Sequence, residues 1–404
     1  MKEKLDFYWQ VAVCGDLTSR FFSNSLTSME SVEKKALLEH FADLEDPRTR
    51  ASPHRLEEIL LVAICGILSG ADGWASVALW GQTKLDWLRQ FLPFENGSAS
   101  HDTFGRVFAL LDAAVFERCF ISWMASVCGV LQGLEVAIDG KTVRRSKSPG
   151  GKAIHLVSAF ASGLGLTLGQ VKTAEKSNEI TAIPELLDAL LLKGCIVTID
   201  AMGCQTTIAA KIVEQGCDYV LSVKNNQPTL AQAVEGFFNG AETTAWEGVP
   251  HTFAEWVEKD HGRIETRRCW VAGDLGCLGK DHKWTQASTL AMVEAIREIG
   301  GVASTERRYY ISSLQADAER MGTVVRGHWG VENGLHWSLD VAYGEDQARM
   351  REGNSAENFS ILRRITLNLL KPDKTVKAGI KNKRLKAGWD DAYRAKILGI
   401  QAIA

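Results

Sequence analysis

Apolar and polar positions divide the chain into a helical first part and a strand-rich centre. From about residue 31 to 130 the apolar residues recur at helical spacing, and EEILLVAICGILSG at 57–70 is apolar nearly all round, as a buried helix is. Ser100 is a suitable N-cap for the apolar-periodic segment that follows it. The pattern predicts an all-α N-terminal domain over 31–130, for which a packing or dimerisation module without chemistry is one interpretation. Residues 1–30 show no clear period and remain an unassigned extension.

The period changes to that of strands after residue 133. Five short apolar runs are separated by turn material or by helical segments, and they lie at 134–143, 153–162, 166–173, 195–200 and 218–224. Helical patterns separate the last three runs, so the order is βββ-α-β-α-β. This order predicts a mixed sheet flanked by helices, which is an α/β core.

The next stretch, about 228–320, breaks this alternation. Its pattern predicts a helix near 229–238, a hairpin through 253–271 and a strand at 308–314. Helical spacing returns around 324–340 and near 355–370. A basic C-terminal tail follows at 371–404.

Composition excludes several classes of protein. The chain has 404 residues, of which 46% are hydrophobic and 24% charged, so wholesale disorder is excluded. Its longest apolar run has ten residues, at 59–68, whereas a bilayer-spanning helix needs about twenty. The N-terminal stretch has no secretory signal pattern, and the nine cysteines include no Cys-x-x-Cys pair. We therefore expect a cytoplasmic protein without a disulfide scaffold or a zinc site.

Positive charge is concentrated although the net charge is only −3. Residues 363–404 carry eleven lysines and arginines against three aspartates, and KTVRRSK at 141–147 holds four cations in seven residues. Such local patches on a near-neutral chain can follow a phosphate backbone. For the C-terminal run, a solvated surface tail is an equally good interpretation.

Two predicted strands end in an aspartate, namely Asp139 after VAI and Asp200 after VTI. Carboxyl ends of strands line the functional crevice of open α/β sheets, so the two carboxylates can meet there. Taken singly, each has an ordinary explanation, because Asp-Gly is a common turn dipeptide and Asp200 can simply begin a loop. A third acid, Glu332, shares one face of a predicted helix with Trp329 and His336.

Three carboxylates without a cysteine or histidine ligand set are hard oxygen donors, suited to Mg²⁺ or Mn²⁺. Two such ions about 4 Å apart activate an attacking oxygen and stabilise a leaving one in phosphoryl transfer. The pattern therefore favours metal-dependent chemistry on a phosphodiester.

Several blocks of sequence resemble one family, the H-repeat-associated (ISAs-type) bacterial insertion-sequence transposases of the DDE superfamily. The similarity runs in order from about residue 31 to 388, and the blocks are DPR (46–48), SHDTF (100–104), IDGKTVR (138–144), KSNEITAIPELL (176–187), TIDAMGCQ (198–205), DYVLSVKNNQ (218–227), HGRIETR (261–267), RYYISS (308–313) and HWGVENGLHWSLDV (328–341).

This resemblance implies an RNase H-like DDE catalytic domain at 131–370, with an insertion at about 228–320. It implies the triad Asp139, Asp200 and Glu332 as catalytic residues that bind two Mg²⁺ or Mn²⁺ ions. The implied activity is strand cleavage at the element's terminal inverted repeats followed by transfer to target DNA, by a homodimer acting in the cytoplasm on the nucleoid.

The chain departs from wider relatives around the glutamate. Those relatives carry Tyr, Arg and Lys at −7, −4 and +7, where this chain has Val325, His328 and Leu339. His328 or Arg326 would take over the phosphate contact. The rivals of Glu332 for the third ligand position are Asp340, Glu345 and Asp346.

The expected DNA contacts are basic, histidine and tryptophan side chains near the proposed metals or on the hairpin. They are Lys141, Arg144, Arg145, Lys224, His261, Arg263, Arg267, Arg326, His328, Trp329 and His336. Trp329 and Trp337 would stack on an unpaired base, although core packing is the commoner role of such residues. Two alternatives to an active transposase stay open: a catalytically silent DNA-binding relic, and a two-metal DNA nuclease.

Overall fold

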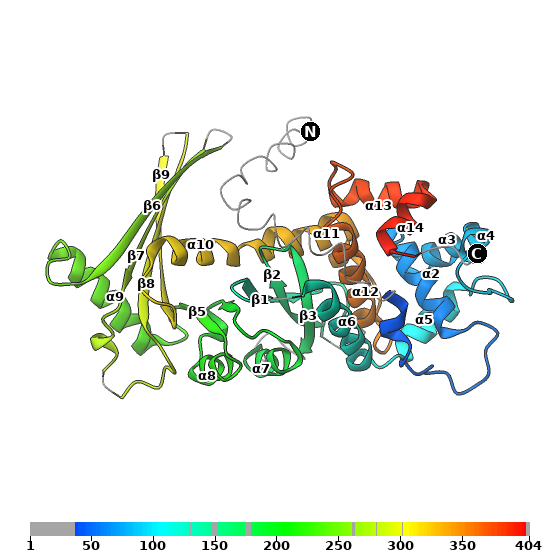
Figure 1. Ribbon diagram of the computed structural model, residues 1–404, viewed down its shortest axis with the longest axis horizontal. Helices are drawn as coiled ribbons and strands as arrows, with labels where there is room; N and C mark the ends of the chain where they lie inside the picture. Colours follow the sequence, from blue (N-terminus) through cyan, green and yellow to red (C-terminus); the bar gives the residue numbers. More distant parts are fainter. Residues whose placement is uncertain are drawn as a thin grey trace.

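The computed structural model describes residues 37–129, 131–147, 152–173, 179–260, 263–279, 281–300 and 302–400. The molecule is elongated, with a helical part at one end, a central sheet flanked by helices, and long strands at the other end (Figure 1). The predicted extension at 1–30 lies outside the described residues. None of the described helices combines the length and the apolar composition needed to cross a bilayer.

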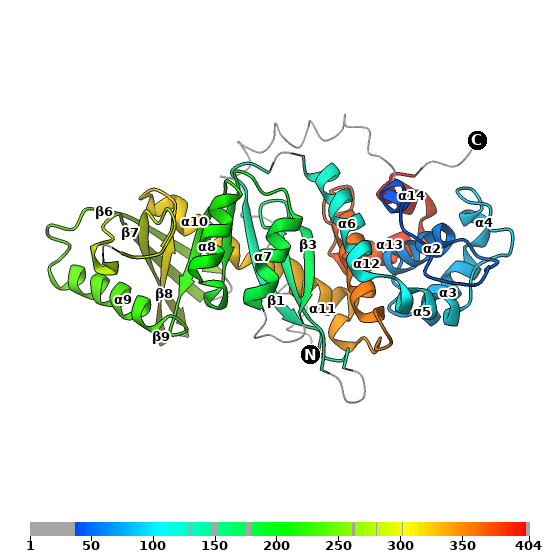
Figure 2. The same cartoon turned by 90° about the horizontal axis from the view of Figure 1, so that it is seen from below.

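The helical part is built from both ends of the described chain (Figure 2). Its N-terminal share consists of a 3₁₀ turn at Leu37–Phe41 and five helices: α2 (Leu56–Leu68), α3 (Trp74–Thr83), α4 (Leu85–Leu88), α5 (His101–Leu110) and α6 (Ala113–Cys128). Twelve of the thirteen residues of α2 are buried, as its apolar pattern predicts. The side chain of Ser100 caps α5 by accepting from the Thr103 N–H at 3.3 Å.

The C-terminal share consists of α12 (Ser355–Leu370), α13 (Ile380–Trp389) and α14 (Asp391–Leu398), and both α12 and α13 pack on α2. Several cations of this basic segment are buried, among them Arg384 and Arg394. Arg384 donates to the carbonyl oxygens of Ile67 and Ala71 at 2.9 and 3.1 Å, at the carboxyl end of α2. Arg384 therefore supplies hydrogen bonds to carbonyl groups at a helix end, which have no N–H partner within the helix.

The central sheet has the strand order of an RNase H-like fold. Strands β1 (Glu135–Thr142), β2 (His155–Ala161) and β3 (Leu166–Thr173) are antiparallel neighbours, whereas β4 (Ile196–Ile199) and β5 (Asp218–Val223) run parallel to β1. Helices α7 (Glu179–Ala189) and α8 (Thr206–Glu214) cover one face. The predicted βββ-α-β-α-β order and the RNase H-like α/β fold class are confirmed.

The segment inserted after β5 extends the same sheet. It contains α9 (Pro228–Thr243), β6 (His251–Asp260), β7 (Arg263–Ala272), β8 (Thr289–Ile299) and β9 (Val302–Ser312). Strand β9 pairs antiparallel with β5, which gives one nine-stranded sheet in the order β3-β2-β1-β4-β5-β9-β8-β7-β6. The expected hairpin at 253–271 corresponds to β6 and β7, and β8 with β9 forms a second hairpin.

A long helical segment crosses the other face of the sheet and joins the two ends of the molecule (Figure 1). It consists of α10 (Ala318–His328), a π-helical turn at Glu332–His336 and α11 (Trp337–Tyr343). Helix α10 packs on β1 and β4 as well as on β6, β7 and β8. This segment places Glu332 beside Asp139 and near the end of β4. Asp139 lies within β1, which continues to Thr142, and not at the strand end that the sequence predicts.

Glu117 on α6 gives a stability prediction, because this carboxyl group is buried against β3. Its Oε1 accepts from the Gln170 N–H at 2.8 Å, and burial raises its pKa to about 8. The folded protein therefore holds a proton that the unfolded chain loses near pH 4.5, so stability falls as the pH rises from about 4.5 to 8. Glu117→Gln should remove this dependence, which has a slope of at most about 1.4 kcal/mol per pH unit. Urea titrations at pH 5 and 8 measure it.

The exposed Glu95→Gln is the matched control and should leave the pH dependence of the free energy of unfolding as in wild type. Equal losses of stability between pH 5 and 8 in wild type and Glu117→Gln would contradict the prediction.

Candidate active site

A cavity of about 180 Å³ lies where the carboxyl ends of β4 and β5 meet the helix that follows the insertion. It contains all three predicted acids. Its lining residues are Asp139, Thr198, Ile199, Asp200, Val220, Ser222, Lys224, Arg308, Tyr310, Val325, His328, Trp329, Val331 and Glu332. The sheet supplies most of the lining, and the long helix supplies the rest.

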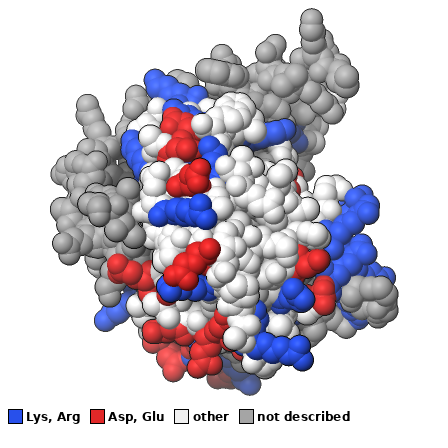
Figure 3. Space-filling model, turned by 90° about the vertical axis from the view of Figure 1, so that its right-hand side faces the viewer, with Lys and Arg blue, Asp and Glu red and all other residues white. Residues whose placement is uncertain are grey.

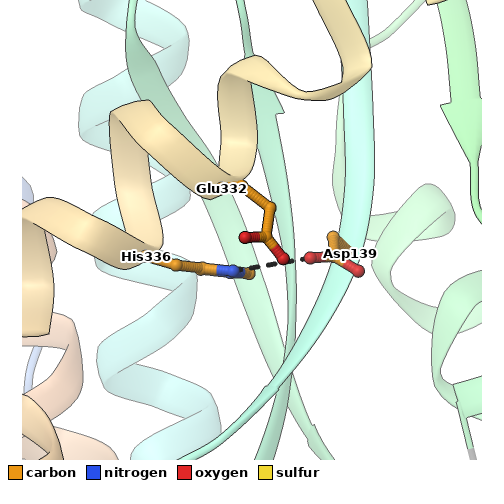
Figure 4. A group of neighbouring side chains, drawn as sticks. All are labelled: Asp139, Glu332 and His336. Atoms are coloured by element: carbon orange, nitrogen blue, oxygen red, sulfur yellow. Dashed lines mark ion pairs between the residues drawn. The ribbon is translucent and has the colours of Figure 1, made fainter. Parts of the chain in front are cut away.

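Asp139 and Glu332 lie together although 192 positions separate them in the chain. One ligand atom each from Asp139, Glu332 and His336 lies within 4.8 Å of the other two. Figure 4 shows Glu332 and His336 pointing from the helix toward Asp139 on the strand. The Nδ1 atom of His336 is 3.4 Å from Oδ2 of Asp139.

Asp200 lines the same cavity but does not belong to this close group. It follows β4 and caps the short 3₁₀ turn Ala201–Gly203, because its Oδ1 accepts from the Met202 N–H at 3.0 Å. Asp200 therefore both begins the loop after β4, as the ordinary explanation of this residue has it, and lines the cavity. One carboxylate oxygen is engaged by the cap.

The electrostatics of the cavity favour a bound cation. Burial raises the pKa of Asp139 to about 7; the N–H of Gly140 opposes this rise, whereas the charges of Asp200, Glu179 and Glu332 add to it. A buried carboxylate with other acids close to it is stabilised by a positive ion placed beside it. Burial lowers the pKa of His336 to about 3, assisted by the positive charges of Lys141 and Arg364, so this imidazole is neutral at pH 7.

His328 is also held as a neutral ring at the cavity wall. Burial lowers its pKa, against the opposing charge of Asp200. Its Nδ1 is 2.9 Å from the hydroxyl of Thr198 on β4. His328 thus stands four residues before Glu332, where wider relatives carry arginine, and its ring is hydrogen-bonded to Thr198 of the sheet.

The π-helical turn sets the direction of Glu332 and His336. Such turns are rare and occur mostly at functional sites, since the extra residue shifts the side chains that follow. Gly334 lies at its centre, and a Cβ there would be 2.8 Å from Cζ of the buried Phe160 ring. A glycine at this position therefore lets the helix approach the sheet closely enough for Glu332 to reach Asp139.

Gly334→Ala should move this turn away from the sheet. Overpacking of this kind costs about 1–3 kcal/mol of stability. A displacement of about 1 Å at a catalytic group lowers rates by about a hundredfold. The rate of DNA strand cleavage and the midpoint of urea unfolding measure the two effects.

Gly330→Ala is the matched control, because its Cβ would lie at an ordinary 3.4 Å from Ser162. This variant should keep both cleavage and stability. Equal cleavage rates in the two variants would show that the close approach at Gly334 does not position the site.

The three rival acids are engaged elsewhere, and none lines the cavity. Asp340 bonds to Lys141, and Asp346 is 3.3 Å from Arg144. Glu345 is completely buried among cations. Among the acids of this helical segment, Glu332 is the one that faces Asp139.

The expected DNA-contact residues divide into several groups. Lys224, His328 and Trp329 line the cavity, and Arg144 and Arg145 are exposed beyond β1. Three arginines near the insertion pair with glutamates: Arg263 with Glu265 at 3.3 Å, Arg267 with Glu258 at 3.0 Å, and Arg326 with Glu258 at 2.8 Å. His261 lies outside the described residues.

Lys141 and His336 are not placed at the surface, as a contact with the DNA backbone requires. Lys141 is only 9% exposed, and its ammonium group is engaged by Asp340 and by Glu345, the latter at 3.4 Å. The ring of His336 is 12% exposed beside Asp139. The physical reason is that both side chains point from β1 and the long helix into the contact between these elements.

Sequence reasoning missed several residues of the cavity wall. Thr198, Ser222, Arg308 and Tyr310 line it, and the Arg308 guanidinium lies 4.5 Å from the centre of the Trp329 ring. Strand periodicity could have shown that Arg308 and Tyr310 point to the same side of the sheet, because alternate residues of a strand share a face and both lie in RYYISS. The sequence did not show that β9 adjoins β5.

Comparison with known proteins gives two family matches. Residues 132–369 match the family model described as "Transposase DDE domain", and residues 38–124 match the one described as "DDE_Tnp_1-associated". The chain is 44% identical over 377 residues to "H repeat-associated putative transposase YhhI" of Escherichia coli (strain K12), which covers 91% of this chain and 98% of the relative. It is 43% identical over 377 residues to "Putative protein YbfL" of the same strain, with the same coverage.

One solved structure, piggyBac transposase in a synaptic complex with hairpin DNA, has a TM-score of 0.43 and 12% identity. The match covers 94% of this chain and 80% of that one. A likeness at this level carries no argument about the site.

Proposed function

The chain belongs to the DDE transposase family, and on this premise we propose that it cleaves DNA strands at the ends of an insertion sequence and joins the freed 3′-hydroxyls to target DNA. The observation that carries this proposal is the meeting of Asp139, Asp200 and Glu332 in one cavity. They come from three separate elements, and phosphoryl transfer on DNA needs such converging acids.

The acids fit a divalent metal. Carboxylate oxygens are the donors that Mg²⁺ and Mn²⁺ prefer, and the neighbouring acids that add to the raised pKa of the buried Asp139 support a cation there. Asp139, Asp200 and Glu332 would hold two ions. Bound ions would supply activation of the attacking oxygen and stabilisation of the leaving oxygen.

Other side chains of the cavity would bind and orient the DNA strand. Lys224 and Arg308 lie on the wall formed by β5 and β9, where their charges can hold phosphate oxygens. Trp329 is 43% exposed and would stack on an unpaired base. His328 is fixed by Thr198 and would orient the phosphate next to Asp200.

Flanking DNA would follow cations outside the cavity, of which Arg144, Arg145 and Arg326 are exposed and Arg263 and Arg267 half-buried. Arg144 and Arg145 lie beyond β1, while Arg263, Arg267 and Arg326 lie on the side of the insertion that α10 covers. Contacts of this kind position a duplex without reading its sequence. We assign the cleavage chemistry to residues 131–370 and the place of action to the nucleoid in the cytoplasm.

The helical part, whose described residues are 37–129 and 355–400, would recognise element ends or join two copies into a homodimer. Figure 3 shows acidic and basic residues interspersed over much of this end of the molecule, with a group of basic residues at its right-hand edge. Large apolar side chains are exposed on this part, including Leu79 at 65% and Trp389 at 77%. These features favour protein contact at this end face.

The test is incubation of the full chain with duplex DNA taken from the two sides of its own coding region. With Mg²⁺ we expect a nick at the element boundary, and EDTA should prevent it. Equal nicking of unrelated branched DNA would indicate a general nuclease. No nicking with Mg²⁺ or Mn²⁺ would indicate a silent DNA-binding relic.

A further inference from the structure

The imidazole ring of His336 lies beside the acid cluster, and its nitrogen atoms could bind a metal ion. The proposed chemistry gives this side chain no role. It lies four residues after Glu332, at the end of the π-helical turn. Its ring points toward Asp139, and Nδ1 approaches Oδ2 of Asp139 to 3.4 Å (Figure 4). The other ring nitrogen, Nε2, is buried and has no hydrogen-bond partner among the described residues.

The separation between His336 and Asp139 is too long for a good hydrogen bond. N–H···O bonds have heavy-atom distances of about 2.7–3.2 Å. In contrast, two ligand atoms that each lie about 2.1 Å from a shared six-coordinate ion are about 3–4 Å apart. The 3.4 Å between Nδ1 and Oδ2 matches this second spacing, and Glu332 offers a third ligand atom within 4.8 Å of both.

We propose that His336 is a nitrogen ligand of the ion held by Asp139 and Glu332. The proposal rests on the proposed function and refines it, because it changes the expected metal. Magnesium takes oxygen ligands almost exclusively, whereas imidazole suits transition metals. This position should therefore select Mn²⁺ over Mg²⁺ more strongly than a site of three carboxylates does.

The experiment uses the full-length protein with Mn²⁺ alone, without DNA, and pulsed electron paramagnetic resonance. Nitrogen that coordinates Mn²⁺ modulates the electron spin echo, and histidine labelled with ¹⁵N changes that modulation. Wild type should show the nitrogen coupling. His336→Gln and His336→Asn should lose it and should bind Mn²⁺ about tenfold more weakly or worse, with little change for Mg²⁺.

His328→Gln is the matched control. His328 lines the same cavity, but its Nδ1 is engaged by Thr198 at 2.9 Å, so this variant should keep the coupling. A wild-type spectrum without nitrogen coupling overturns the proposal, even if both His336 variants fail to fold. Loss of the coupling in His328→Gln and its survival in His336→Gln would also overturn it.

The two proposals fail separately. Nicking at element ends by a protein whose bound Mn²⁺ shows no nitrogen coupling would leave the transposase function standing and remove His336 from the ligand set. Nitrogen coupling from His336 in a protein that never nicks DNA would support the ligand assignment and contradict the proposed activity.

Discussion

Asp139→Asn should abolish strand cleavage and leave the fold and DNA binding in place. Asparagine has almost the same shape, but it lacks the charge that the proposed ions need. Loss of such electrostatic stabilisation lowers rates by about a hundredfold to a thousandfold, and a first metal ligand should be at the upper end. Single-turnover nicking of element-end DNA measures the rate, and a gel-shift titration measures binding.

Stability should not fall in Asp139→Asn. Burial and the nearby acids raise the pKa of Asp139, so its charged form is unfavourable in the folded protein above pH 7. A neutral side chain removes that penalty. Urea unfolding at pH 8 should therefore give a free energy at least as large as that of wild type.

Asp340→Asn is the matched control for cleavage. Asp340 belongs to the same helical segment as Glu332 but bonds to Lys141 outside the cavity. This variant should cleave within a fewfold of the wild-type rate. Full activity of Asp139→Asn, or a thousandfold loss in Asp340→Asn, would place the reacting centre elsewhere.

The core of the fold was predictable because its strands are short apolar runs separated by strong turn signals. CIVTID between Gly194 and Gly203 is an example, and a strand buried on both faces has this form. Once the order βββ-α-β-α-β is known, few topologies remain. The parallel pairing of Ile138 with Ile199 then brings Asp200, just after β4, level with Asp139 within β1.

The joining of the insertion to the sheet was not predictable in this way. Strand β8 (Thr289–Ile299) and its hairpin with β9 have an apolar half and a charged half, so neither strand shows one clean alternation. The pairing of β5 with β9 is a long-range contact between segments about 90 residues apart, and no local pattern encodes it.

The site was predictable in its acids but less so in their neighbours. The strand pattern grouped Asp139 with Asp200, whereas Glu332 was assigned to them from the family resemblance around HWGVEN together with its helix face. The π-helical turn was not foreseen, because apolar periodicity does not distinguish it from an α-helix, and it gives His336 its place at the cluster. The burial of Lys141 was hidden because its partners, Asp340 and Glu345, lie about 200 residues later.

Glu345 is the centre of a buried ion cluster that connects the active-site strand with the helical part. It is completely buried; its Oε1 is 3.3 Å from Arg364 on α12, and its Oε2 is 3.4 Å from Lys141 on β1. Burial alone would raise the pKa of Glu345, but Arg364, Arg363 and Lys141 outweigh it and lower the pKa to about 2. The carboxylate is therefore charged in the folded protein at neutral pH.

Glu345→Gln should lower the free energy of unfolding at pH 7 by about 3–5 kcal/mol, because it leaves buried cations without their partner. The stabilisation by the charged carboxylate is complete above pH 4.5, the ordinary value, and is lost as the pH falls toward 2. The difference in the free energy of unfolding between wild type and Glu345→Gln should therefore become smaller as the pH falls below 4.5, and urea titrations measure it. Asp340→Asn removes the more exposed partner of the same lysine and should cost less than about 1 kcal/mol. Equal stability of wild type and Glu345→Gln at pH 7 would contradict the prediction. It would mean that other groups stabilise the buried cations and that the contact between α12 and β1, the strand that carries Asp139, does not depend on Glu345.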